Sequence, residues 1–150
     1  MSEIRDLYQQ TILDHNKAPR NFRKMENADK AVEGYNPLCG DHYTVFLKFE
    51  KDTIADISFQ GSGCAISKAS ASVMSSMLKG KSKAEAEEFF QKFHDLITGK
   101  ISSQEHLDAL GKLTAFSGVC EFPSRVKCAI LAWHTLRAGV HENSTTVTTE

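Results

Sequence analysis

Residues 43–60 read YTVFLKFEKDTIADISFQ, and this stretch decides the fold class. Every second residue is apolar on each side of the polar pair Lys51-Asp52. The alternating positions are Tyr43, Val45, Leu47 and Phe49 before this pair and Ala55, Ile57 and Phe59 after it. Alternation of period two predicts strands with one buried face, and a short polar turn between two of them predicts an antiparallel hairpin. A shorter strand at Ala31–Tyr35 brings the expected sheet to about three strands.

Helical segments are expected on both sides of this hairpin, because apolar residues recur there at intervals of three and four. Within the stretch Gly80–Lys112, two helices are expected to begin with a Ser-x-x-Glu sequence, Ser82–Glu85 and Ser102–Glu105, which is typical of a helix-capping box. The expected segments are Ser2–His15, Cys64–Lys79, the helical stretch Gly80–Lys112, and a last helix from Pro123. We therefore predict an α+β fold in which a small antiparallel sheet is covered by several helices. Residues 1–138 should form a single domain, and the polar, threonine-rich residues 139–150 a flexible C-terminal tail.

The composition excludes several classes of protein. The chain has 150 residues and a formal net charge of −1, so it has no overall positive field to attract nucleic acid or anionic lipid. No apolar run approaches the roughly 20 residues of a membrane span, and the N-terminus has no apolar signal region. We therefore expect a cytoplasmic protein. Cysteines in that reducing compartment suggest metal or redox chemistry rather than structural disulfides.

Cys39 and Asp41 are separated by Gly40. Residues two apart point the same way in an extended backbone, and glycine permits close approach to an ion. The alternative for this motif is a surface turn with an incidental cysteine. His42 should point to the opposite face from Asp41, which makes it a poor candidate ligand.

Two further cysteines lie where a thiolate is favoured. Cys64 follows a Gly-Ser-Gly turn and begins a helix, whose free N–H groups and dipole stabilise negative charge. Cys128 lies one turn after Arg125 and next to Lys127. Each could equally be a small buried core residue, which is common for free cysteine. Cys120 has neither feature, and we interpret it as structural or incidental.

Together, three thiols and one carboxylate could complete a tetrahedral zinc site. Four ionised ligands would exceed the charge of the ion by about two negative charges. Arg125 and Lys127 are suitable partners for that excess. A carboxylate is a harder donor than a thiolate, so such a site is better suited to exchanging a ligand than to locking a fold.

Several motifs resemble those of one known family in the same order along the chain. They are Tyr8 with Ile12-Leu13-Asp14-His15, Pro19-Arg20-Asn21, Asn36-Pro37-Leu38-Cys39-Gly40-Asp41, Gly61-Ser62-Gly63-Cys64-Ala65-Ile66-Ser67 and Phe122-Pro123-Ser124-Arg125-Val126-Lys127-Cys128-Ala129. The sequence resembles the IscU/NifU iron–sulfur cluster assembly family, and within it the SufU-type branch. Scaffold-type members carry a histidine where this chain has Lys127. SufU-type members also have an extra helical stretch, which here is Gly80–Lys112.

This resemblance implies one zinc ion held by Cys39, Asp41, Cys64 and Cys128. It also implies a partner, a PLP-dependent cysteine desulfurase of the SufS type, whose persulfide sulfur is accepted by Cys39 after a desulfurase histidine takes over a zinc position. The sulfur then passes to a downstream iron–sulfur scaffold. Arg125 is a candidate for holding the released thiolate. By this resemblance the protein is a zinc-dependent sulfurtransferase that works only with its desulfurase.

Two other functions are compatible with the same residues. One is a scaffold that assembles a labile iron–sulfur cluster on the same ligands. The other is a structural zinc domain that acts only as a binding partner.

Overall fold

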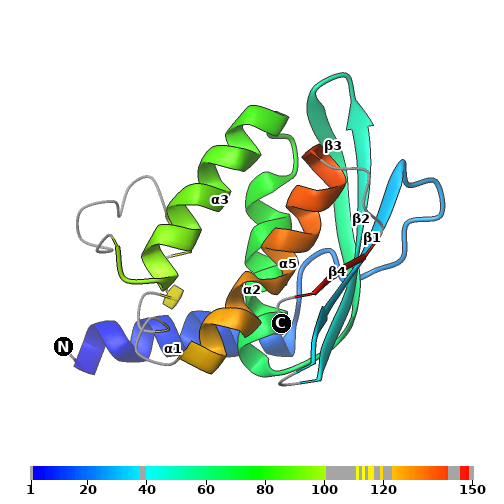
Figure 1. Ribbon diagram of the computed structural model, residues 1–150. Coiled ribbons are helices and arrows are strands. Elements are labelled where there is room, and N and C mark those ends of the chain that lie inside the picture. The colour runs from blue at the N-terminus through cyan, green and yellow to red at the C-terminus, as the bar shows by residue number, and fades with distance from the viewer. Residues whose placement is uncertain are drawn as a thin grey trace.

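The computed structural model describes residues 2–37, 40–100, 111, 113, 115, 116, 119, 123–141 and 146–148. The described elements are α1 (Ser2–Lys17), β1 (Lys30–Asn36), β2 (Asp41–Glu50), β3 (Thr53–Ser62), α2 (Ala65–Leu78), α3 (Lys83–Ile97), α5 (Pro123–His141) and β4 (Thr146–Thr148). Figure 1 shows a twisted sheet with helices packed against one of its faces. The predicted α+β class is confirmed.

The predicted hairpin is formed by β2 and β3, which pair antiparallel and are joined by a turn in which Lys51 has a φ of 59°. β1 pairs antiparallel with the other edge of β2, and its last residue Asn36 lies opposite Asp41. These three strands are the ones expected. The sheet order is β3-β2-β1-β4, because the short strand β4 adds in parallel to the outer edge of β1.

The apolar face of the hairpin forms the base of the core. The side chains of Tyr43, Val45 and Leu47 are fully buried, as alternation predicts. α2 and α5 lie between the sheet and α3 (Figure 1). Trp133 of α5 stacks on Phe93 of α3 with ring centroids 4.8 Å apart. The core therefore continues from the sheet through α5 to the outer helix.

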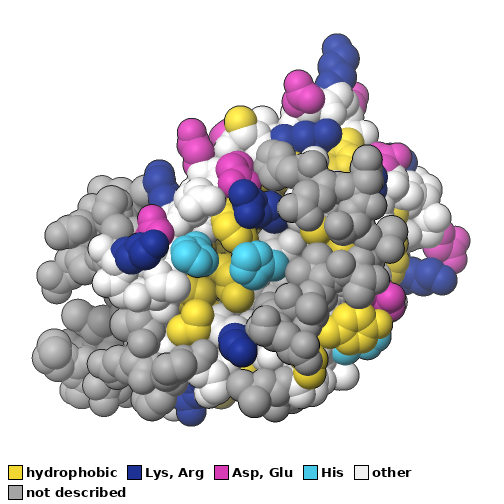
Figure 2. All heavy atoms as spheres, in the orientation of Figure 1, with side chains coloured by type: hydrophobic (Ala, Val, Ile, Leu, Met, Phe, Trp, Pro, Cys, Tyr) yellow, Lys and Arg dark blue, Asp and Glu magenta, His cyan; other side chains and the backbone are white. Residues whose placement is uncertain are grey.

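On the outer surface of α3 and α5, polar and charged side chains surround the aromatic ring of Phe90. Figure 2 shows histidine, basic and acidic side chains gathered over these two helices with hydrophobic side chains between them. Arg137 forms an ion pair with Glu87 at 3.1 Å and lies over the ring of Phe90, whose edge also meets His134. These contacts attach α3, which lies inside the predicted extra stretch Gly80–Lys112, to α5.

Helix boundaries follow the local signals. α1 ends at Lys17, before Pro19, and α2 begins directly after its N-cap residue Cys64. Ser82 and Glu85 form the predicted capping box at the start of α3. The second box, Ser102–Glu105, lies outside the described residues.

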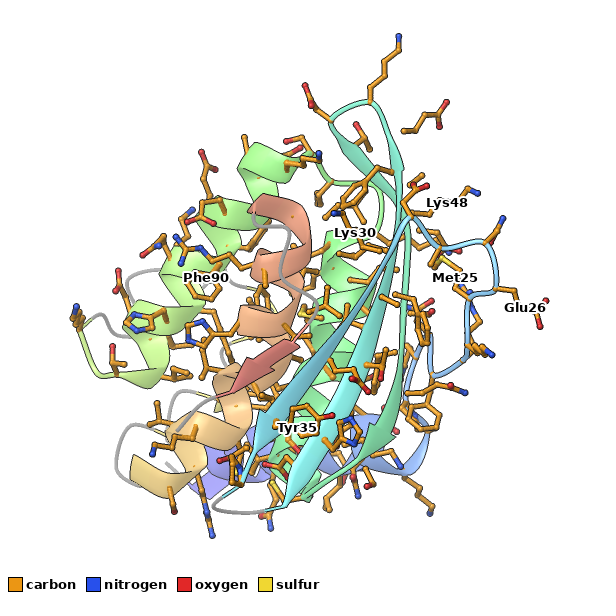
Figure 3. All side chains as sticks on the ribbon, turned by 45° about the vertical axis from the view of Figure 1, so that its right-hand side comes forward. Met25, Glu26, Lys30, Tyr35, Lys48 and Phe90 are labelled. Atoms are coloured by element: carbon orange, nitrogen blue, oxygen red, sulfur yellow. The ribbon has the colours of Figure 1, made fainter. Side chains whose placement is uncertain are left out.

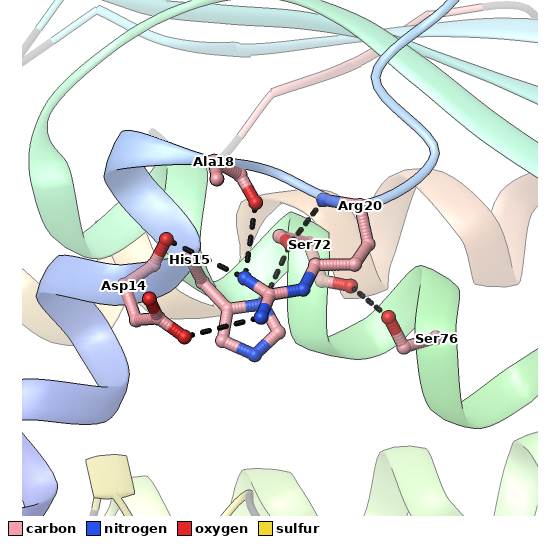
Figure 4. A network of polar contacts seen from close by, with 6 residues as sticks. All are labelled: Asp14, His15, Ala18, Arg20, Ser72 and Ser76. Carbon is pink, nitrogen blue, oxygen red and sulfur yellow. Dashed lines mark hydrogen bonds and ion pairs between the residues drawn. The ribbon is translucent and has the colours of Figure 1, made fainter.

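α1 is attached to α2 by a polar network that is buried at His15 and Ser72 and exposed at Asp14 and Arg20 (Figure 4). His15 is almost fully buried, and its Nδ1 lies 2.7 Å from the hydroxyl oxygen of Ser72. The backbone N–H of Arg20 donates to the same oxygen at 2.8 Å, and the Arg20 guanidinium pairs with Asp14 at 3.1 Å. The segment after α1 is therefore held against the middle of α2.

The C-terminal segment continues the fold beyond residue 138. α5 extends to His141, and Thr146–Thr148 pair with Glu33–Tyr35 of β1. The flexibility expected for 139–150 stays a prediction. Among the helices of the described part of the chain, none has the length and hydropathy needed to cross a membrane. The cytoplasmic location also stays a prediction.

Candidate metal centre

Three of the expected ligands converge where the sheet meets two helices. Asp41 is the first residue of β2, Cys64 caps α2, and Cys128 lies in the N-terminal part of α5. One ligand atom from each lies within 4.8 Å of those of the other two. Asp41 and Cys128 are buried, with exposed fractions of 1% and 2%, whereas Cys64 is half-buried. The cluster is therefore reached from the side of Cys64.

The Gly-Ser-Gly sequence before Cys64 lets these elements come together. Gly61 has a φ of 140°, and a Cβ there would overlap the backbone of His42. A Cβ on Gly63 would lie only 2.5 Å from Asp41 Oδ1. Glycine is therefore required at the end of β3 because the backbone passes directly against the neighbouring strand and its carboxylate.

Both carboxylate oxygens of Asp41 accept hydrogen bonds. Oδ1 accepts from the backbone N–H of Cys64 at 2.9 Å and from the hydroxyl of Ser67 at 3.2 Å. Oδ2 accepts from the side-chain amide of Asn36 at 3.0 Å. These hydrogen bonds fix the orientation of the carboxylate.

The two thiols also have donors. Ser67 N–H donates to the sulfur of Cys64 at 3.4 Å, so that this sulfur caps α2. The Asn36 amide donates to the sulfur of Cys128 at 3.4 Å. The expectation that Cys64 lies at a helix N-terminus is confirmed.

Burial and the charges of the cluster both act on Tyr43, whose hydroxyl lies 3.1 Å from that of Ser67. Burial raises the pKa of Tyr43 to about 12, and the nearby negative charges of Asp41, Cys64 and Cys128 add to this effect against the Ser67 hydrogen bond. Tyr43 therefore stays a neutral hydrogen-bonding group beside an anionic cluster.

The other candidate site residues are Cys39, Cys120, Arg125 and His42. Cys39 and Cys120 lie outside the described residues, so their positions relative to this cluster are predictions. Arg125 is exposed in the first part of α5. His42 is exposed and stacks on Tyr35, with ring centroids 4.3 Å apart, as expected for a side chain on the opposite face from Asp41. Figure 3 shows Tyr35 at the end of β1 that leads to the cluster and Lys30 at the other end.

Three polar residues of the site were not anticipated as functional residues: Asn36, Ser67 and Tyr43. The position of Ser67, three residues after a helix-capping Cys64, is a local signal that could have indicated its contact with that sulfur. No comparable signal exists for Asn36, because its contact with Cys128 joins residues 92 positions apart.

The donor set fits zinc. Zinc–sulfur and zinc–oxygen bonds of about 2.0–2.3 Å in a tetrahedron place neighbouring ligand atoms about 3.5–3.8 Å apart. Atoms within 4.8 Å reach that spacing by shifts of about 1 Å or less. Three anionic ligands, two of them soft thiolates, match the ligand preference of zinc and also of iron–sulfur clusters.

The sequence profile of the NifU-like N terminal domain family matches residues 7–147. The chain belongs to this family. The predicted family resemblance is thereby confirmed, and this NifU-like domain is a member of an iron–sulfur cluster assembly family.

Individual relatives of this NifU-like domain have two different descriptions. It is 42% identical over 134 residues to the zinc-dependent sulfurtransferase SufU of Bacillus subtilis, covering 89% of each chain. It is 35% identical over 144 residues to the iron–sulfur cluster assembly scaffold protein IscU of Streptococcus pyogenes, covering 96% of this chain and 89% of the other. A Fervidobacterium islandicum protein described as an iron–sulfur cluster assembly scaffold for the SUF system has the same fold, with a TM-score of 0.81, 39% identity, and coverage of 87% and 94%.

Proposed function

We propose that this NifU-like domain is a SufU-type, zinc-dependent sulfurtransferase. It would accept persulfide sulfur on Cys39 from a PLP-dependent cysteine desulfurase of the SufS type and pass it to a downstream iron–sulfur scaffold. The observation that carries the proposal is the convergence of Asp41, Cys64 and Cys128. The similarity to the B. subtilis sulfurtransferase supports the same function.

Cys39 is proposed as the fourth ligand and the acceptor because of its position in the chain. Asn36 and Asp41 form the last pair of the β1–β2 ladder, and Cys39 lies between them in the sequence. Two residues span at most about 7 Å, so the backbone of Cys39 is never far from that of Asp41. Cys128, by contrast, is buried in α5 and is therefore the poorer candidate for leaving the ligand set.

The proposed transfer is balanced without a further reactant. The Cys39 thiolate attacks the terminal sulfur of the desulfurase persulfide. A new sulfur–sulfur bond forms on Cys39 as the old one breaks, and the desulfurase cysteine leaves as a thiolate. Bound zinc would keep the ligand thiols deprotonated at neutral pH. Arg125, exposed at the start of α5, is the proposed cationic partner for the released Cys39 thiolate.

A second candidate function is a cluster scaffold on the same ligands. The identity to the S. pyogenes scaffold protein favours it. One feature argues against the scaffold function. Lys127 occupies the position at which scaffold-type members carry a histidine ligand. If the protein were a purely structural zinc domain, no sulfur would reach Cys39.

The decisive experiment incubates the zinc-loaded protein with a SufS-type desulfurase and cysteine, then measures the mass of the Cys39 peptide. One added sulfur on Cys39, and none in a Cys39→Ser variant, is the expected result. Zinc, iron and inorganic sulfide are measured separately on protein purified without oxygen and without added metal. Iron with inorganic sulfide in place of zinc would establish the scaffold function, and zinc without any added sulfur would leave only the structural role.

A further inference from the structure

We infer that Asn36 is a positioning residue of the metal centre: its side-chain amide holds Asp41 and Cys128 together as a ligand pair. The inference rests on the proposed metal site, but it concerns the protein before any sulfur is transferred.

The geometry of Asn36 is that of a bridge. It is the last residue of β1 and is 1% exposed. Its nitrogen Nδ2 lies 3.0 Å from Asp41 Oδ2 and 3.4 Å from Cys128 Sγ. An amide carries two N–H groups, so it can donate one to each acceptor. One side chain thus links the start of β2 to α5.

The amide oxygen of Asn36 indicates which contacts determine the orientation of the side chain. Asn36 Oδ1 is buried, and the described residues supply it with no hydrogen-bond partner. Turning the amide over would place this oxygen against Asp41 Oδ2, which is also an acceptor, and would remove the N–H donor from the sulfur of Cys128. An unsatisfied buried carbonyl oxygen destabilises the fold. The favourable contacts of Asn36 are therefore all made by its nitrogen, with two candidate ligands.

The amide also suits the charge of the site. It stabilises two anionic ligands without bringing a cation that would repel the metal. Ser67 has the corresponding role for the other pair, since it donates to both Asp41 and Cys64. Asn36 and Ser67 together connect the three ligands before an ion is present. Asn36 makes the longer connection, between the sheet and α5.

The test measures zinc affinity by chelator competition in the absence of desulfurase, together with the melting temperature of the zinc-free protein. Asn36→Leu has nearly the same size but removes both donors and the unsatisfied oxygen. We expect its zinc Kd to rise about 10–100-fold, as for other groups that orient metal ligands. The zinc-free melting temperature should fall by only a few degrees, because loss of the buried orphan oxygen offsets part of the cost of leaving Asp41 Oδ2 and Cys128 Sγ without this donor.

Ser58→Ala is the matched control. Ser58 on β3 is fully buried and its hydroxyl also has no partner among the described residues, but it pairs with Phe46, away from the end of β2 at which Asp41 lies. Its removal should leave the zinc Kd unchanged. If Asn36→Leu does not fold, Asn36→Ser decides the question, because a hydroxyl has one donor where the amide has two. A several-fold higher Kd supports the inference, and a parental Kd in the folded variant overturns it.

A metal-free measurement separates this inference from the proposed function. In zinc-free protein, the side-chain N–H resonances of Asn36 should be protected from hydrogen exchange and should lose that protection in Asp41→Ala. Unprotected resonances in the parent would overturn the bridge. A failure of sulfur transfer with these resonances protected would instead contradict only the proposed function.

Discussion

Gly63 offers a direct test of the site geometry, because a single methyl group added there points into the ligand cluster. The Cβ of Gly63→Ala would lie 2.5 Å from Asp41 Oδ1, 2.6 Å from Ser67 Oγ and 2.8 Å from Tyr43 OH. Ordinary contacts begin at 3.4 Å, so Asp41 would have to retreat by about 0.9 Å. That shift is several times the roughly 0.2 Å tolerance of metal–ligand distances.

Two separate effects should follow from Gly63→Ala. Overpacking and the strained hydrogen bonds to Asp41 should lower the free energy of unfolding of the zinc-free protein by about 2 kcal/mol. This corresponds to a melting temperature lower by about 4–8 °C for a chain of this size. The zinc Kd should rise by at least about 10-fold, because the carboxylate no longer reaches the ion in its original position.

Gly139→Ala is the matched control for this prediction. Its Cβ would also be crowded, at 2.8 Å from Leu47 Cδ1 and 3.1 Å from Val32 Cγ2, but these atoms are apolar and belong to the core. The assays are thermal unfolding of the zinc-free protein in excess chelator, and zinc affinity measured by chelator competition. We expect Gly139→Ala to keep the parental zinc Kd. A parental Kd in Gly63→Ala, or an equal loss in Gly139→Ala, would refute the reasoning.

Three further predictions concern other parts of the chain. Cys120→Ser should keep both one zinc per chain and the added sulfur after desulfurase treatment; zinc loss from this variant in metal analysis would make Cys120 a ligand. Ser82→Ala should lower the free energy of unfolding by about 1 kcal/mol in chemical denaturation, because it removes the capping box of α3, and an unchanged midpoint would contradict that role. Although burial alone raises the pKa of Asp56, the hydrogen bonds from Arg23 at 2.8 and 2.9 Å and the N–H of Ile57 lower it overall. A pKa that is lower in the folded state contributes stability that is present above about pH 4 and is lost as the pH falls through the folded pKa. The difference in melting temperature between the parent and Asp56→Asn should therefore shrink below pH 4, and a difference that stays constant down to pH 2 would contradict the assignment.

Local features of the fold were predictable because their signals lie within a few residues of one another. The alternation in residues 43–60 led directly to the β2–β3 hairpin. Ser82 and Glu85 indicated the start of α3, and Cys64 the start of α2. Each of these depends on the geometry of one element, with a period of two residues in a strand or 3.6 in a helix.

Other features depended on contacts between distant segments. The parallel addition of Thr146–Thr148 to β1 was not anticipated, because a short threonine-rich segment has no hydrophobic pattern that marks it as a strand. The contacts of Asn36 with Cys128 and of Ser67 with Asp41 were equally hidden, since each joins residues that are far apart in the chain.

The sequence by itself determined the α+β class, the hairpin, the helix caps and, through its cysteine motifs, the family. Only the tertiary structure decided that Asp41, Cys64 and Cys128 meet, and that Asn36 turns its nitrogen toward two of them. The physical reason is that β2, α2 and α5 are brought together by burial of the hydrophobic core, whose packing sets distances to within an ångström. A residue pattern carries no such distances between segments that are far apart in the chain.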